Sequence, residues 1–228
     1  MNKGVNTGEL LLRELEKRYT VRREDVGADA RLSKNGMAFE TESYVVEGLG
    51  HYCIMRMKAM LGLMKMETAV LSPVGKDLPL FNLDWVKAMG KETQIVEIYD
   101  TQLQPLATSA IDAFEQIRGR DRDLEDYSSG KAHWYDAILY PCSYHKTGKG
   151  VSARLARAAG DYVQAYLKLT EDAPDCDVAA KEEKVRAFAE TLFEQGGPAV
   201  DQVTRLFGRD CAKRLILRWM YGVGEKES

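Results

Sequence analysis

Asp100 is the residue of this sequence best placed to move a proton. Residues 92–100 alternate so that Val96, Ile98 and Asp100 share one face of a strand, and Asp100 ends that otherwise apolar row. A carboxylic acid in apolar surroundings resists ionisation, so its pKa rises into the range in which it can deliver a proton near neutral pH. The spacing therefore makes Asp100 a candidate proton donor. The alternative is a strand-end Asp that caps the following turn.

Glu67 is the second candidate acid. It shares a strand face with Ala69 and Leu71, which would again place a carboxyl group among apolar neighbours. The alternative is an exposed glutamate on a half-solvated sheet, since glutamate is rarely buried.

Methionines are concentrated near these acids. Two neighbouring strand-like segments contain five of them, namely Met55, Met57, Met60, Met64 and Met66. Flexible thioethers suit the wall of a pocket for a large, flat, apolar ligand, but they also serve as ordinary core filling.

A basic segment follows in the second half of the chain. Residues 137–160 contain no Asp or Glu, whereas Lys146, Lys149, Arg154 and Arg157 supply four positive charges. On a chain whose net charge is −3, such a segment could form a local site for an anionic ligand or an acidic partner protein. The alternative is the solvated start of a helix.

The elements that must position these residues change character near residue 105. Segments 38–47, 51–60, 64–73 and 92–100 are predicted strands, and 78–89 is also expected to be extended. Their short connections favour antiparallel pairing. Helical spacing predicts helices at 9–19, 107–118, 151–169, 180–195 and 208–221, with loops at 22–37 and 119–131. Strands followed by helices predict an α+β fold, and we expect a single domain over residues 1–228.

Composition narrows the classes of function. Hydrophobic residues make up 45% of the 228 and charged residues 29%, which is typical of a globular protein. The charge gives no reason to expect nucleic acid or a membrane as partner, and no segment is apolar enough to span a bilayer. Three histidines without ligand spacing and four scattered cysteines argue against a metal site or disulfide framework and favour the cytoplasm. No flavin or nicotinamide motif is present.

Three segments together resemble a known family. VLSP at 70–73, LPLFNLDWV at 78–86 and IVEIYDTQ at 95–102 resemble the central block of the ferredoxin-dependent bilin reductases. That block contains a strand, a Pro-x-Phe-Gly-x-Asp segment and a second strand that ends in Asp. The last helix of the family resembles residues 208–221. Three departures are Asn82 in place of the usual glycine, Tyr140 in place of an expected arginine, and the lack of an acid at Tyr221 and Gly222.

The resemblance implies a three-layer α/β/α sandwich around a central antiparallel sheet. It also implies reduction of a linear tetrapyrrole such as biliverdin, with electrons supplied singly by ferredoxin and no tightly bound cofactor or metal. The proton donor of the family falls on Asp100, and a residue of the neighbouring strand falls on Glu67. The expected substrate-binding residues are Met66, Leu80, Phe81, Asn82, Ile98 and Gln102. Lys146, Lys149, Arg154 and Arg157 are expected to meet the propionates or an acidic ferredoxin. We expect a monomer.

Two other functions remain open at this point. A tetrapyrrole-binding protein without catalytic activity could use the same fold and pocket. A helix-rich interaction protein, in which the methionine-lined sheet is only core, would need no pocket.

Overall fold

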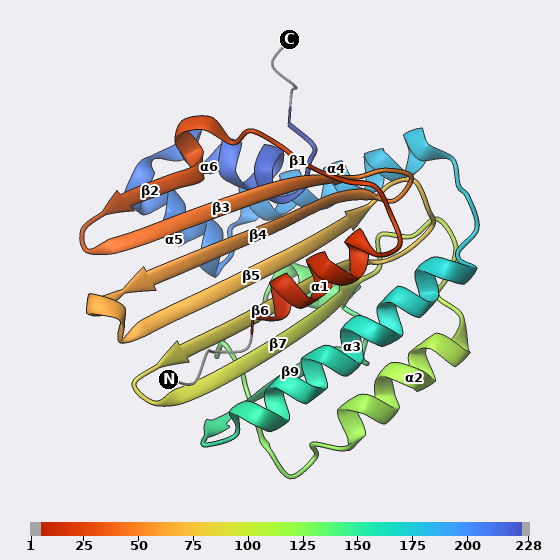
Figure 1. Ribbon diagram of the computed structural model, residues 1–228, viewed down its shortest axis with the longest axis horizontal. Helices are drawn as coiled ribbons and strands as arrows, with labels where there is room; N and C mark the ends of the chain where they lie inside the picture. The colour runs from red at the N-terminus through yellow and green to blue at the C-terminus, as the bar shows by residue number, and fades with distance from the viewer. Residues whose placement is uncertain (1–5, 225–228) are drawn as a thin grey trace.

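The centre of the protein is a nine-stranded antiparallel sheet (Figure 1). The computed structural model describes residues 6–224. The strand order is β1-β3-β4-β5-β6-β7-β9-β8, and β2 also pairs with β3. The strands are β1 (Val21–Arg23), β2 (Arg31–Lys34), β3 (Met37–Val46), β4 (Gly50–Ala59), β5 (Met64–Pro73), β6 (Leu80–Ala88), β7 (Lys91–Tyr99), β8 (Glu125–Asp126) and β9 (Tyr144–Lys149).

Helices cover both faces of this sheet. α1 (Thr7–Glu16), α2 (Thr108–Gly119) and α3 (Ser152–Asp172) lie in front of it in Figure 1. α4 (Val178–Gln195), α5 (Pro198–Phe207), α6 (Arg209–Lys213) and a π-helix (Arg214–Met220) lie behind it. Short 3₁₀ turns occur at Gly27–Ala30, Met60–Gly62 and Trp134–Ile138. The predicted α+β sandwich with a central antiparallel sheet is confirmed.

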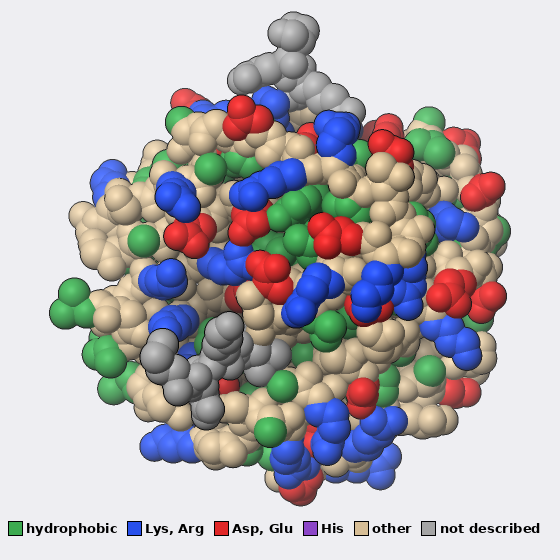
Figure 2. Space-filling model, in the orientation of Figure 1, with side chains coloured by type: hydrophobic (Ala, Val, Ile, Leu, Met, Phe, Trp, Pro, Cys, Tyr) green, Lys and Arg blue, Asp and Glu red, His purple; other side chains and the backbone are tan. Residues whose placement is uncertain are grey.

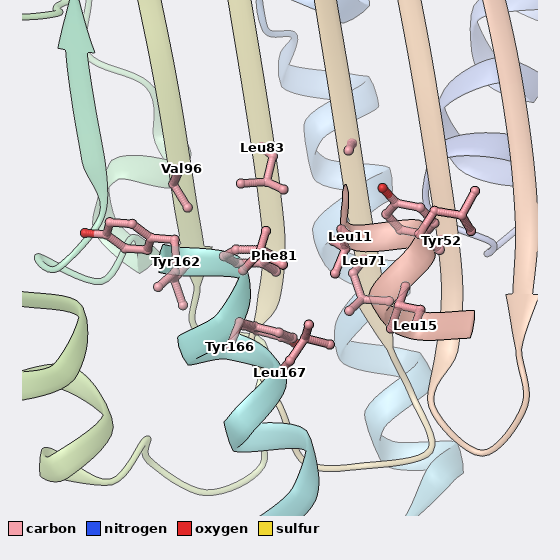
Figure 3. Packing of buried hydrophobic residues seen from close by; sticks show 14 of the residues in the cluster. Leu11, Leu15, Tyr52, Leu71, Phe81, Leu83, Val96, Tyr162, Tyr166 and Leu167 are labelled. Carbon is pink, nitrogen blue, oxygen red and sulfur yellow. The ribbon is translucent and has the colours of Figure 1, made fainter. Parts of the chain in front are cut away.

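The front core forms because α1 and α3 each present an apolar stripe to the sheet. Leu11 and Leu15 of α1 are fully buried against the sheet (Figure 3). Phe81 of β6 stacks on Tyr166 of α3 with ring centroids 4.4 Å apart. The Tyr166 hydroxyl donates to the Pro79 carbonyl at 2.6 Å, which satisfies the one polar atom of that side chain. This face is therefore densely packed.

A second core fills part of the space behind the sheet. The predicted apolar face of α4, with Val185, Phe188 and Ala189, is buried there together with Leu215 and Ile216 of the π-helix. Gly196 ends α4 with φ of 82°, a left-handed conformation that glycine adopts without strain. The turn it makes brings α5 back towards the sheet.

Several elements differ from the sequence-based expectation. The predicted loop at 22–37 contains β1 and β2, edge strands too short to show alternation. The predicted helix at 208–221 is divided into α6 and the π-helix. Strand β9 and helix α5 were not predicted. β9 contains three consecutive polar residues followed by Gly148, a composition that does not favour a strand. It is extended because it pairs with β7.

Replacement of Phe81 by alanine tests the front core. Phe81→Ala should lower the free energy of unfolding by about 3–5 kcal/mol, because it opens a cavity beneath α3. Urea denaturation measures the change, with Val178→Ala as the exposed control, expected within about 0.5 kcal/mol of wild type. A loss below about 1 kcal/mol for Phe81→Ala would contradict this packing.

Candidate active site

A cavity of about 390 Å³ lies between the sheet and the C-terminal helices. Its floor comes from alternate residues of four adjacent strands, namely Met66, Thr68, Asn82, Asp84, Val86, Ile95, Glu97, Tyr99 and His145. Its roof comes from the segment 127–136, the turn before α5 and the π-helix, with Tyr135, Pro198, Ile216, Met220 and Tyr221 among the lining residues. A cavity of this size and position is typical of a small-molecule site.

Two carboxylates on the floor share one amide. The Asn82 side-chain nitrogen donates to Asp84 Oδ2 at 2.8 Å and to Glu97 Oε2 at 3.1 Å. Thr68 donates its hydroxyl to the other Asp84 oxygen. β5, β6 and β7 hold these side chains in place because Thr68 pairs with Asp84, and Asn82 pairs with Glu97, across the strands. The result is a fixed acid pair that faces the cavity.

Asp84 is the acid whose protonation is most altered. Desolvation raises the pKa of its carboxyl group to about 6, and the negative charge of Glu97 adds to the rise. The hydrogen bonds from Thr68 and Asn82 act in the opposite direction but do not cancel these effects. Asp84 can therefore exist as a neutral acid, able to donate a proton, in the range in which an ordinary aspartate is fully ionised.

His145 and Tyr99 extend the polar part of the site. His145 Nε2 lies 3.3 Å from Glu97 Oε1, but the nitrogen is buried and makes no hydrogen bond. The Tyr99 hydroxyl donates to Glu97 Oε2 at 2.5 Å, and burial raises the pKa of this tyrosine well above its usual value. This buried nitrogen therefore has a carboxylate beside it but no hydrogen bond, and a bound ligand could supply one.

Apolar and aromatic groups form the remaining walls. Tyr135 contacts Tyr99 edge-to-face with ring centroids 5.8 Å apart, and Met66 and Met220 supply flexible thioethers. Burial raises the pKa of Tyr135 and of Tyr221, so both hydroxyls stay neutral. Such walls suit the faces of a flat, largely apolar molecule.

A second cavity of about 650 Å³ adjoins the first. The two share Tyr127, Asp136 and His145 as lining residues. Arg118, Arg122 and Lys146 line the second cavity together with Glu115, Asp126 and Asp136, so its charges balance, whereas the first cavity is acidic. Arg118 is paired with Glu115 at 2.8 Å. Lys146 is paired with Asp126, so Arg122 is the cation of this lining for which the structure gives no ion pair, and an anionic arm of a ligand in the first cavity could reach it.

The structure corrects the expected surroundings of Asp100. This residue is exposed, and it lines neither of the two adjoining cavities. The alternation of β7 explains its position: Val96 and Ile98 face the front core, so Asp100 continues the row that points away from the cavity. The apolar row marks the face that packs against α1 and α3 and not the face that lines the cavity.

Glu67 is buried as expected, but on the face opposite the cavity. Its Oε1 accepts a hydrogen bond from the Gly8 backbone at 2.9 Å, and its Oε2 accepts one from Arg56 at the same distance. Arg56 also pairs with Glu9 and Glu42. Desolvation raises the pKa of Glu67, while these partners act against the rise. Glu67 thus ties the start of α1 to the sheet.

The expected substrate-binding residues are divided between the two faces. Met66 and Asn82 line the cavity. Phe81 and Ile98 belong to the front core, which corrects their assignment. Leu80 is packed in the core behind the sheet without lining the cavity. Gln102 is also outside it, where its side chain accepts a hydrogen bond from Tyr140 at 3.1 Å.

The predicted basic site is largely neutralised by acids from the preceding loop. Arg154 pairs with Asp121 at 2.8 Å and with Asp123 at 2.6 Å. Arg157 lies 3.3 Å from Asp121. Lys146 is buried and pairs with Asp126 at 2.6 Å, and both residues line the second cavity. Lys149 is exposed at the end of β9. These four residues do not form one continuous site.

Within residues 6–224, no three His, Cys, Asp or Glu side chains are grouped so that they could hold a metal ion. The polar groups of the cavity can donate, accept and relay protons, and its walls can cover a flat ligand.

Comparison with known proteins finds solved structures that share the fold of this chain. No family model matches the sequence, and no curated protein matches it. Among the solved structures that match is phytochromobilin synthase from tomato in complex with biliverdin. Its TM-score is 0.76 at 15% sequence identity, and the match covers 96% of this chain and 84% of that chain. At this identity the likeness shows a shared fold.

The acid pair yields a prediction about titration. In carboxyl-resolved NMR, the Asp84 signal should titrate with a midpoint near 6, well above the ordinary value of 3.8. Glu97→Gln should lower that midpoint, because it removes the neighbouring negative charge. Glu67→Gln, on the opposite face, is the matched control and should leave the midpoint unchanged. An Asp84 midpoint near 4 in the unmodified protein would contradict the described environment.

Proposed function

We propose that this protein binds a linear tetrapyrrole of the biliverdin type in the acid-lined cavity and reduces it. The observation that carries the proposal is the Asp84 carboxyl group, whose pKa is raised to about 6 inside a cavity with aromatic and thioether walls. The fold is shared with a protein solved in complex with biliverdin, and the segments at 70–102 resemble the bilin reductases.

Binding follows from the shape and chemistry of the cavity. The pyrrole rings would lie against the floor strands, covered by Met66, Met220 and the aromatic rings of Tyr135 and Tyr221. The propionate groups would extend into the adjoining cavity towards Arg122, for which the structure gives no ion pair. Asp84 and the His145 Nε2 atom, which makes no hydrogen bond within the protein, would meet the polar nitrogens or the terminal lactam oxygens.

Reduction of one double bond consumes two electrons and two protons. In our proposal, two molecules of reduced ferredoxin each give up one electron and are oxidised, and the bilin receives one proton with each electron. Asp84 donates a proton from its neutral form and becomes a carboxylate beside Glu97. Repulsion between these two charges favours the return of a proton from solvent, by way of Glu97 and His145.

This assignment transfers the proton-donating role from Asp100 to Asp84. The two residues differ in the property that the reaction needs, because Asp84 lines the cavity with a raised pKa and Asp100 is exposed outside it. Glu67 receives a structural role in place of a catalytic one.

The decisive variants are Asp84→Asn and Asp100→Asn. Both should bind biliverdin with a shifted absorption spectrum. Under anaerobic conditions with reduced ferredoxin, Asp84→Asn should lose turnover by about 100- to 10,000-fold, the usual contribution of a positioned acid, and Asp100→Asn should reduce the pigment at nearly the wild-type rate.

The same assay separates the alternative functions. A spectral shift without consumption of the pigment by the wild-type protein would identify a non-catalytic binding protein. The absence of any shift would overturn the proposal altogether. If Asp100→Asn instead lost turnover and Asp84→Asn kept full activity, Asp100 would be the proton donor.

A further inference from the structure

Large apolar side chains project into solvent from two adjacent hairpin turns. The turn between β4 and β5 exposes Met60, Leu61 and Leu63 by 58%, 106% and 68%, and the turn between β6 and β7 exposes Met89 by 83%. The turns are neighbours because Met64 pairs with Ala88 where the strands meet them. Figure 2 shows hydrophobic side chains projecting at the left edge, over these turns.

The backbone at these turns indicates that their side chains are selected for something other than the turn itself. Met60, Leu61 and Met89 have φ of 52°, 54° and 51°, the left-handed conformation in which glycine and asparagine are usual. A third turn at the same end of the sheet, between β2 and β3, has the usual Asn35 before its glycine, and each of the three turns contains one glycine with positive φ, namely Gly36, Gly62 and Gly90. Methionine and leucine at these positions are unfavourable for two reasons, namely the left-handed backbone conformation and the exposure of their apolar side chains to water.

Lysines surround these apolar side chains. Six lie on the strand ends beside the three turns and beside the end of β9, namely Lys34, Lys58, Lys65, Lys87, Lys91 and Lys149. Lys87 is paired with Glu92 and Lys91 with Glu125. For the other four the structure gives no ion pair. This end of the sheet is therefore positive on a chain whose net charge is −3.

We propose that this end of the sheet docks on an anionic lipid surface. The apolar side chains of Met60, Leu61, Leu63 and Met89 would enter the boundary between headgroups and acyl chains, and the lysines would meet lipid phosphates. The long lysine stems can lie along the apolar side chains while their ammonium groups reach the headgroups. The proposal is independent of the function assigned to the cavity.

Two observations favour lipid over an acidic protein. The apolar groups project from narrow turn tips, whereas a protein partner would require a broad complementary surface with a fully buried centre. The lysines lie at the strand ends, behind the turn tips. If the tips entered the acyl-chain boundary, the lysines would therefore lie at the depth of the lipid phosphates. No helix among residues 6–224 is long and apolar enough to cross a membrane, so the proposed contact is peripheral.

Vesicle co-sedimentation of the full chain tests the proposal. The protein should bind vesicles of mixed phosphatidylcholine and phosphatidylglycerol, bind pure phosphatidylcholine far more weakly, and dissociate as salt is raised. The double variant Leu61→Ser, Met89→Ser should bind the anionic vesicles at least about tenfold more weakly, because two apolar anchors are lost.

Val178→Ser is the matched control. Val178 is an exposed apolar residue, at 47%, and it lies at the other end of the sheet, where neighbouring Cys176 contacts the Val74 carbonyl. It should bind vesicles like the wild type. All three proteins should retain their circular dichroism, since the changed side chains are exposed.

Two outcomes would overturn the proposal. One is failure of the wild type to bind anionic vesicles at low salt, and the other is equal binding by the double variant. If vesicles are not bound but the double variant slows electron transfer from ferredoxin, the surface serves an acidic protein and the lipid proposal is wrong.

Discussion

The hydrogen bonds from the Asn82 amide to Asp84 and Glu97 determine the chemistry of the cavity. They hold two carboxylates side by side in a place where neither is fully hydrated, so the second charge is costly. As a result the pKa of Asp84 is raised, and its carboxyl group can hold a proton next to the cavity. Tyr135, Tyr221 and the His145 nitrogen that makes no hydrogen bond line the same cavity as this carboxyl group.

Strand alternation separates the site from the core. On β6 and β7, residues 81, 83, 96 and 98 pack against α1 and α3, which leaves residues 82, 84, 95, 97 and 99 for the cavity. A shift of pairing by one residue would bury the two acids under α3 and expose the front core. The stack of Phe81 on Tyr166 therefore also fixes the direction in which Asp84 points.

The fold could be predicted from the sequence because the main strands and helices show clear periodicity. The site could be predicted only in part. The sequence predicts the alternation of residues 95–100, but the apolar row with Val96 and Ile98 faces the front core and not the ligand, contrary to expectation. A row this uniformly apolar belongs to a dry core, and the mixed row with Glu97 was the better signal. Asp84 indicates the ligand face in the same way, because it is an acid within a buried strand. The contribution of His145 could not be foreseen, because β9 has no strand pattern of its own.

A crystal structure of the biliverdin complex tests the central claim most directly. It should show the pigment between the sheet and the C-terminal helices, with a pyrrole nitrogen or lactam oxygen within about 3 Å of the Asp84 carboxyl group, the reach needed for proton transfer. Pigment bound beside Asp100 or on the face covered by α3, with Asp84 left without contact to it, would contradict the account.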